Sequence, residues 1–233
     1  MLNVPALTAV LSPASPIAHV EVLNPDIDPG ELSDKRAVLD ILVRFANGTN
    51  VDVEMQVRPH HSLEERLVFY WARVFSAQLG SGDSHAALKP VIGVYFLDFI
   101  RLPTQRLHST FHINEDHEGY PLTDALELHF LELPRFAKLP LPSGAAALSD
   151  GDPTDELVYW CKFLCAESEH DLEALAMANQ DMSAAKQALD LLSADPIARR
   201  LAENRIVWDW AYRTDMAHER EEGRQEGLNE GEK

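Results

Sequence analysis

The chain has 233 residues, of which 45% are hydrophobic and 25% charged, a composition typical of a globular protein. No apolar run approaches the roughly 18 residues of a membrane span, and no basic segment opens a secretory signal, so we expect a cytoplasmic protein. The formal charge of −18 argues against a broad electrostatic surface for nucleic acid. Residues 141–233, with 9 Lys and Arg against 20 Asp and Glu, carry −11 of that charge.

Five prolines interrupt the first 30 residues, so the longest helix-compatible piece there, residues 6–11, is short. Residues 18–23 alternate between apolar and polar types, which predicts an edge strand.

The pattern that organises the chain is a hairpin over residues 38–57. Two strands, 38–45 and 51–57, are predicted on either side of a loop. Period-2 alternation directs one apolar set toward the core and places a second set on the other face: Asp40, Leu42, Arg44, Asp52, Glu54 and Gln56. One register that matches the faces uses residues 47–49 as a three-residue loop and pairs Ala46 with Asn50. That register sets Asp40 opposite Gln56 and diagonal to Glu54, at about 7–8 Å between Cα atoms.

The polar face of this hairpin predicts a metal site. The carboxylates of Asp40 and Glu54 and the amide oxygen of Gln56 are the hard oxygen ligands that suit Mg²⁺ or Mn²⁺. A structural alternative for Asp40 is an ion pair with Arg44 or Arg58. Asp52 shares the face, but its place near the turn indicates a solvated carboxylate.

A helix is expected over residues 63–79, opened by a capping box at Ser62 and ended by Gly80. Further strands are predicted at residues 91–99, 108–113 and 126–133, the first of them covered on both faces. The latter two carry His108, His112 and His129, which raise a zinc hypothesis; without fixed ligand spacing, hydrogen-bonded or exposed histidines are the better interpretation.

The C-terminal part is predicted to be helical. A linker rich in Pro, Gly, Ala and Ser precedes helices at residues 154–165, 169–179 and 183–192 and a last helix from Pro196. Cys161 and Cys165 lie in the first of these and are interpreted as packed, reduced thiols. The expected domains are a core over 1–136, a linker over 137–153, a helical region over 154–218 and a charged tail over 219–233.

Several stretches, taken in order, resemble one protein family. They are VEVLNP (20–25), DKRAVLDILV (34–43), VDVEMQ (51–56), EERLVFYWARVFSAQL (64–79), LKPVIGVYFLDF (88–99), HSTFHI (108–113) and LELHFLELPRF (126–136). This succession is similar to the recombination-promoting nuclease and transposase family of the PD-(D/E)XK nuclease superfamily.

The resemblance implies an α/β (α+β) fold of the restriction-endonuclease kind, a mixed sheet flanked by helices and followed by a helical C-terminal region. It also implies Mg²⁺- or Mn²⁺-dependent hydrolysis of DNA phosphodiesters, with Asp40 and Glu54 as metal ligands. Gln56 stands where most of the superfamily has a lysine, so it can hydrogen-bond the attacking water but not deprotonate it. Arg66, Arg58 and Arg44 are candidate DNA-contacting residues, and the helical C-terminal region is a candidate surface for a homo-oligomer.

One departure from the family pattern keeps a second function open. Family members begin with a helix that carries an Asp, and this segment would precede Met1. The alternative is therefore a catalytically inactive, N-terminally truncated remnant that acts as a DNA- or protein-binding module.

Overall fold

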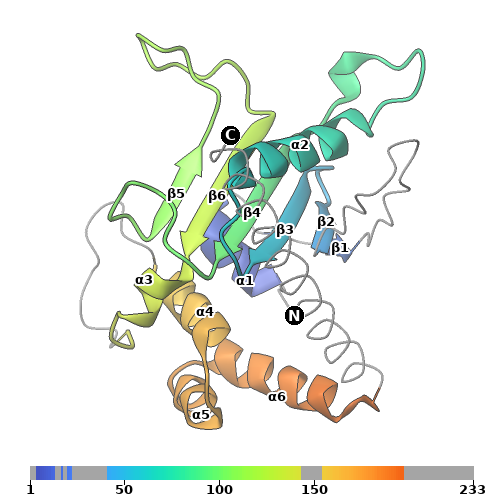
Figure 1. The fold of residues 1–233 in the computed structure, drawn as a ribbon. Helices are drawn as coiled ribbons and strands as arrows, with labels where there is room; N and C mark the ends of the chain where they lie inside the picture. The colour runs from blue at the N-terminus through green and yellow to red at the C-terminus, as the bar shows by residue number, and fades with distance from the viewer. Residues whose placement is uncertain (1–3, 14–16, 18–19, 23–40, 143–153, 197–233) are drawn as a thin grey trace, which may run out of the picture. The chain divides into compact units, whose positions relative to one another are not determined.

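A computed structural model describes residues 4–13, 17, 20–22, 41–142 and 154–196 (Figure 1). Its strands are β1 (Val20–Val22), β2 (Ile41–Phe45), β3 (Asn50–Gln56), β4 (Val91–Leu97), β5 (His108–Phe111) and β6 (Leu126–Glu132). Its helices are α1 (Val4–Leu11), α2 (Leu63–Ser76), the 3-10 turn η1 (His85–Ala87), α3 (Leu133–Ala137), α4 (Asp155–Cys165), α5 (Glu169–Ala178) and α6 (Gln180–Ala194).

The six strands form one mixed sheet in the order β1-β2-β3-β4-β6-β5. β3, β4 and β6 are parallel to one another, while β1, β2 and β5 pair antiparallel at the two sides. Parallel strands need crossover connections, and α2 supplies the one between β3 and β4. This is the predicted α+β, restriction-endonuclease-like architecture, with β1 as the predicted edge strand.

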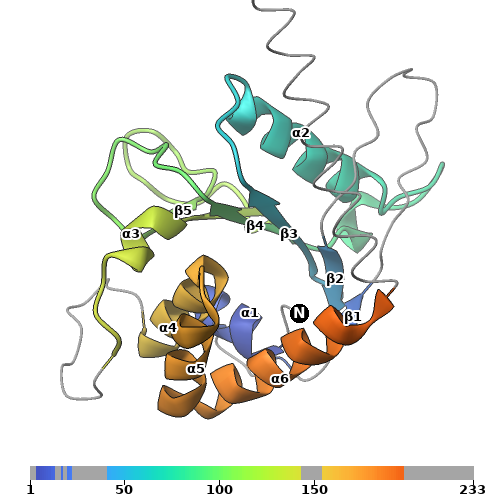
Figure 2. The ribbon, with the colours of Figure 1, turned by 60° about the horizontal axis from the view of Figure 1, so that its bottom comes forward.

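Helices cover both faces of the central strands. α2 lies on one side of the sheet, while α1 and α4 lie on the other (Figure 2). Leu63 and Leu67 of α2 pack in one apolar cluster with Tyr95 and Leu97 of β4. Because both faces of β4 are covered, only Ile92 among its seven residues is not fully buried, as expected for a nearly continuous apolar run.

The register of the β2–β3 hairpin differs from the one predicted. Arg44 pairs with Asn50, and the Phe45 N–H donates to the Thr49 carbonyl at 2.8 Å, so the three-residue loop is 46–48. The reason is Gly48, whose φ of 90° belongs to the last position of such a loop. The shift preserves the predicted faces of the described residues, since Leu42 still lies beside Asp52.

The start of α2 also departs from the prediction. Ser62 precedes the helix, but its side chain makes no capping hydrogen bond, because its backbone (φ −110°, ψ 41°) is not extended. α4 begins as predicted, with the Thr154 hydroxyl accepting from the Leu157 N–H at 3.2 Å. α6 begins at Gln180, three residues before the predicted start.

The described residues up to Met182 belong to one compact unit, and those from Ser183 onward belong to a second. Within the first unit, α4 contacts α1, α3 and α5. The last predicted helix and the charged tail lie outside the described residues, and the predicted domain boundaries stay a prediction. Among the helices that the structure describes, none is both long and apolar enough to cross a membrane.

Candidate functional site

The polar residues of β3 lie on the face covered by α2, and both carboxylates among them are buried. Asp52 is 0% exposed and Glu54 is 3% exposed, while Gln56 at the end of the strand is half-buried. The prediction of a solvated Asp52 is therefore wrong. The cause is the central position of β3, which has a strand on each side and helices over both faces, whereas a hairpin at a sheet edge would leave this side in water.

A chain of hydrogen bonds connects α2 with the carboxylate of Glu54. Arg66, in the first turns of α2, donates from Nη2 to Oε1 of Gln56. The Nε2 of Gln56 in turn donates to Oε2 of Glu54 at 2.8 Å. Because a guanidinium only donates, it directs the amide oxygen of Gln56 toward Arg66 and the amide nitrogen toward Glu54. The orientation of Gln56 is thus set by its two neighbours.

Tyr95 of β4 lies beside these groups on the same face. Its register partner is Glu54, and its hydroxyl reaches back over Gly93, the partner of Asp52. The side chain is 0% exposed, and burial, followed by the negative charges of Asp52 and Glu54, raises the pKa of Tyr95 well above its usual value. Among the described residues, the hydroxyl has no hydrogen-bond partner.

The predicted site residues are brought together only in part. Glu54, Gln56 and Arg66 are connected, and Asp40 lies outside the described residues. Arg58 follows β3 by two residues and is half-buried. Arg44 donates to the side chain of Asn50 at 3.0 Å. Asn50 is six residues before Gln56 in β3, so Arg44 lies about 20 Å along the strand from Gln56.

Two residues at this face were missed by sequence reasoning, Asp52 as a buried carboxylate and Tyr95. A signal for Tyr95 was present in the pattern Gly-Val-Tyr of the central strand. A glycine inside a strand often marks the close approach of another group, and here that group is the tyrosine hydroxyl itself.

A second buried carboxylate, Glu132, ends β6 and is saturated by protein donors. It accepts from the backbone N–H groups of Arg101 and Leu102, the latter at 2.9 Å. Its other oxygen accepts from Arg135 Nε at 2.7 Å. Arg101 also binds both carboxylate oxygens of Glu64 in α2, at 2.6 and 2.8 Å. These contacts hold the loop after β4 against the start of α2.

The histidines of β5 and β6 form a hydrogen-bonded cluster with Glu127. Nε2 of His129 lies 2.8 Å from Oε1 of Glu127, and Nδ1 of His129 lies 2.7 Å from Nε2 of His108. Burial and the neighbouring His129 lower the pKa of His108 to about 4, and the bond from His129 lowers the pKa of Glu127. The ring nitrogens face one another, as the hydrogen-bonded interpretation predicts.

Comparison with protein families decides the kind of protein. Residues 4–217 match the family described as PD-(D/E)XK nuclease family transposase. The chain belongs to this family. Its membership indicates a nuclease or transposase role and a DNA substrate, and nucleases of the PD-(D/E)XK type generally use divalent metal ions. The comparisons with curated proteins and with solved structures found no match.

The donor set of this nuclease family member fits a divalent cation of the Mg²⁺ type. Asp52 and Glu54 offer carboxylate oxygen atoms, which such ions prefer. Within the described ranges, no three His, Cys, Asp or Glu residues are arranged to hold a metal ion, so two described carboxylates would need a further ligand. The family resemblance assigns that role to Asp40.

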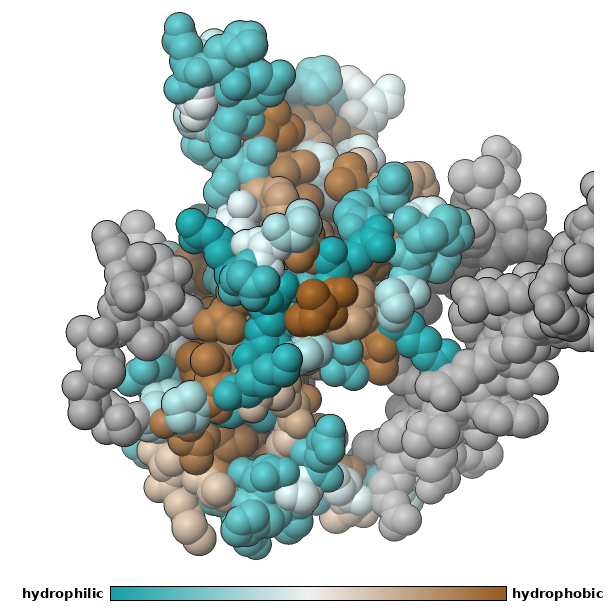
Figure 3. Space-filling model, turned by 60° about the vertical axis from the view of Figure 1, so that its left-hand side comes forward, coloured by the Kyte–Doolittle hydropathy of each residue, from teal (hydrophilic) through white to brown (hydrophobic). Residues whose placement is uncertain are grey.

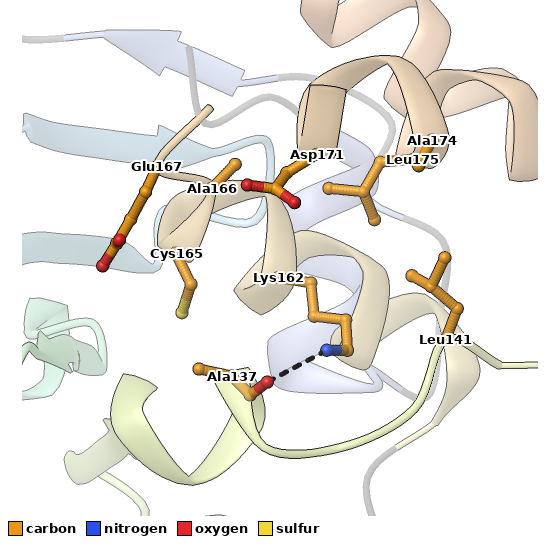
Figure 4. Close-up of a pocket in the computed structure, with 9 residues that line it drawn as sticks. All are labelled: Ala137, Leu141, Lys162, Cys165, Ala166, Glu167, Asp171, Ala174 and Leu175. Atoms are coloured by element: carbon orange, nitrogen blue, oxygen red, sulfur yellow. Dashed lines mark hydrogen bonds between the residues drawn. The ribbon is translucent and has the colours of Figure 1, made fainter. Parts of the chain in front are cut away.

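A separate pocket of about 300 Å³ lies between α3, α4 and α5 (Figure 4). It is lined by Lys162, whose Nζ donates to the Ala137 carbonyl at 3.3 Å, and by Cys165, whose pKa burial raises to about 11. It contains none of the predicted site residues, and a protonated thiol is a poor nucleophile.

On the face seen in Figure 3, hydrophobic residues lie in separate areas between hydrophilic ones.

Proposed function

We propose that this protein is a metal-dependent DNA endonuclease that hydrolyses phosphodiester bonds and acts in transposition or recombination. The observation that carries the proposal is the hydrogen-bonded chain from Arg66 through Gln56 to Glu54, on the two-carboxylate face of β3 in a member of a nuclease family. The two hydrogen bonds fix the orientation of the Gln56 amide beside Glu54, which supports a role in the site rather than in packing alone.

In this proposal Asp40 and Glu54 are the ligands of Mg²⁺ or Mn²⁺. Asp40 is joined to Ile41, whose partner in β3 is Val53, the residue before Glu54. Neighbouring Cα atoms along the chain are about 3.8 Å apart. Each proposed ligand is therefore the direct sequence neighbour of one member of the Ile41–Val53 pair. The ion, when bound, supplies Lewis-acid activation of the phosphate and of the attacking water.

The remaining residues bind and orient. Gln56 has an amide group whose free hydrogen-bonding positions can hold a water molecule, but it cannot accept a proton as a general base at neutral pH. Arg66 keeps Gln56 in place and offers positive charge to a phosphate oxygen. Arg58 and Arg44 are proposed to contact phosphates further along the DNA.

Nicking of supercoiled plasmid DNA tests the proposal. We expect the purified chain to nick it with Mg²⁺ or Mn²⁺ and to stop doing so in EDTA. Asp40→Ala and Glu54→Ala should each abolish nicking, while Asp83→Ala, in the turn after α2, should leave it unchanged. Nicking that survives both site substitutions would exclude the proposed site. DNA binding without nicking by the unaltered chain would instead favour the binding-module alternative.

A further inference from the structure

The buried hydroxyl of Tyr95 is the polar group on the α2 face whose presence packing does not explain. The ring itself is held by apolar neighbours, with the Phe130 ring centroid at 5.3 Å and Leu63 and Leu67 of α2 in the same cluster. A phenylalanine would make all of these contacts. Burying a hydroxyl without a hydrogen bond costs about 1–3 kcal/mol, so its retention calls for a partner.

The position of the hydroxyl indicates where that partner lies. A Cβ built on Gly93 would be 2.4 Å from the hydroxyl oxygen, so the phenol occupies the space above the glycine. The residue paired with Gly93 in β3 is Asp52, and the residue paired with Tyr95 is Glu54. The hydroxyl therefore points along the strand into the region beside two buried carboxylates.

The charge state of the phenol fits a donor. A tyrosine hydroxyl has an ordinary pKa of about 10, so at neutral pH the group is uncharged and keeps its proton. A neutral O–H can donate to a carboxylate oxygen or to a water on a cation without adding negative charge to the site. Asp52 is the nearest candidate acceptor by register, and its own side chain is 0% exposed.

We propose that Asp52 and Tyr95 extend the metal site: Asp52 is an additional carboxylate for the hydrated divalent cation, and the Tyr95 hydroxyl is the donor that positions it. Tyr95 acts through Asp52 and the ligand shell and is a positioning residue. The inference rests on the proposed metal-dependent function, but it concerns residues to which the family resemblance assigns no role.

Mn²⁺ binding measured by electron paramagnetic resonance of the free ion tests this directly, without DNA or turnover. Tyr95→Phe removes one oxygen and leaves the ring contacts intact. We expect Tyr95→Phe and Asp52→Asn each to weaken Mn²⁺ binding by about tenfold, the loss typical of outer groups that orient metal ligands. Circular dichroism of each variant serves as the check that it is folded.

The matched control is Tyr159→Phe. Tyr159 is also buried, and its hydroxyl donates to the Pro142 carbonyl at 3.0 Å, away from β3. This variant should bind Mn²⁺ as tightly as the unaltered chain. If Tyr95→Phe also binds equally tightly, the role of Tyr95 is wrong, and if Asp52→Asn does so, the additional carboxylate is wrong. Asp52→Asn decides alone if Tyr95→Phe does not fold.

The two proposals fail in different ways. If the unaltered chain takes up no Mn²⁺, or if Glu54→Gln leaves uptake unchanged, the metal site of the proposed function is wrong and the inference falls with it. If uptake depends on Glu54 but not on Tyr95 or Asp52, only the inference is overturned.

Discussion

Glu54 and Glu132 are two almost fully buried glutamates, one near the C-terminal end of β3 and one at that of β6, and they differ in what surrounds them. They are 3% and 1% exposed. Glu132 is bound by two backbone N–H groups and by Arg135, which is itself largely buried. Glu54 accepts from the amide of Gln56, which is neutral and is held from the far side by Arg66.

We propose that this difference separates a structural carboxylate, Glu132, from a functional one, Glu54. The partners of Glu132 neutralise its charge and occupy both oxygens, so it has little capacity left for a ligand. The amide of Gln56 orients the carboxylate of Glu54, and a second carboxylate, Asp52, shares its face. Burial alone therefore does not distinguish the two glutamates, whereas the charge of their hydrogen-bond partners does.

The largest expected effect is on stability at Glu132. Glu132→Gln keeps the volume but turns an amide NH₂ or a neutral oxygen toward Arg135, leaving that guanidinium buried without its counter-charge. We expect a loss of about 3 kcal/mol in the free energy of unfolding, the range for breaking a buried ion pair. Urea denaturation measures it.

The matched variant at the other glutamate sharpens the comparison. Glu54→Gln retains an oxygen that can accept from Gln56, and it should change the free energy of unfolding by about 1 kcal/mol or less while abolishing nicking. If Glu54→Gln proves the more destabilising of the two, the proposed distinction between a structural Glu132 and a functional Glu54 is wrong.

The next effect concerns pH and the cluster on β5 and β6. The pKa of His108 is about 4 in the folded chain against an ordinary 6.5, so between these values the unfolded chain binds a proton that the folded chain does not. Stability should therefore fall as the pH falls through this window, by at most about 1.4 kcal/mol per pH unit. Below the ordinary pKa of 4.5, Glu127 should add to the loss, because its folded pKa is also lowered.

Urea denaturation at pH about 7 and about 5 checks the sign. His108→Gln should flatten the dependence, whereas His117→Gln, on the exposed loop between β5 and β6, should not. An equal slope in His108→Gln would show that another group titrates. Such a result would also weaken the view that this cluster, like Glu132, is structural and apart from the Glu54 face.

Period-2 alternation was sufficient to predict the faces of the hairpin. It placed Leu42, Asp52, Glu54 and Gln56 together, as observed. It did not determine the register, because a shift of both strands by an even total leaves every face unchanged. The position of Gly48 in the loop carried the missing information, since only the last loop residue takes a positive φ.

Burial was harder to predict from the sequence than pairing. Asp52 was expected in solvent because a hairpin alone has an open face, and only the crossover through α2 closes it. The link between Arg66 and Gln56 joins residues ten apart on a helix and a strand, so neither periodicity could show it. The family resemblance, in contrast, identified the fold and the class of protein.

A smaller effect is expected where Arg66 holds Gln56. Arg66→Met keeps the aliphatic part of the side chain but removes the donor. The amide of Gln56 can then rotate and lose its hydrogen bond to Glu54. We expect nicking to slow by about tenfold with little change in stability, as for other groups that orient a ligand. Arg73→Met, two turns further along α2, is the control and should nick normally. Equal rates in both variants would mean that the chain of hydrogen bonds does not serve the site.

The smallest expected effect is on stability at two helix N-caps, Ser62 of α2 and Thr154 of α4. Like the two glutamates, they are similar residues with different contacts. Thr154 has an extended backbone with ψ of 155°, and its hydroxyl accepts from the Leu157 N–H; at Ser62 ψ is 41° and the hydroxyl makes no such bond. Thr154→Ala should therefore cost about 1 kcal/mol in unfolding free energy, whereas Ser62→Ala should cost about 0.3 kcal/mol or less. Urea denaturation of the two variants decides the point. A similar loss in both would mean that Ser62 does cap α2 in solution, and the start of that helix, where Arg66 lies, would then differ from the arrangement that orients Gln56.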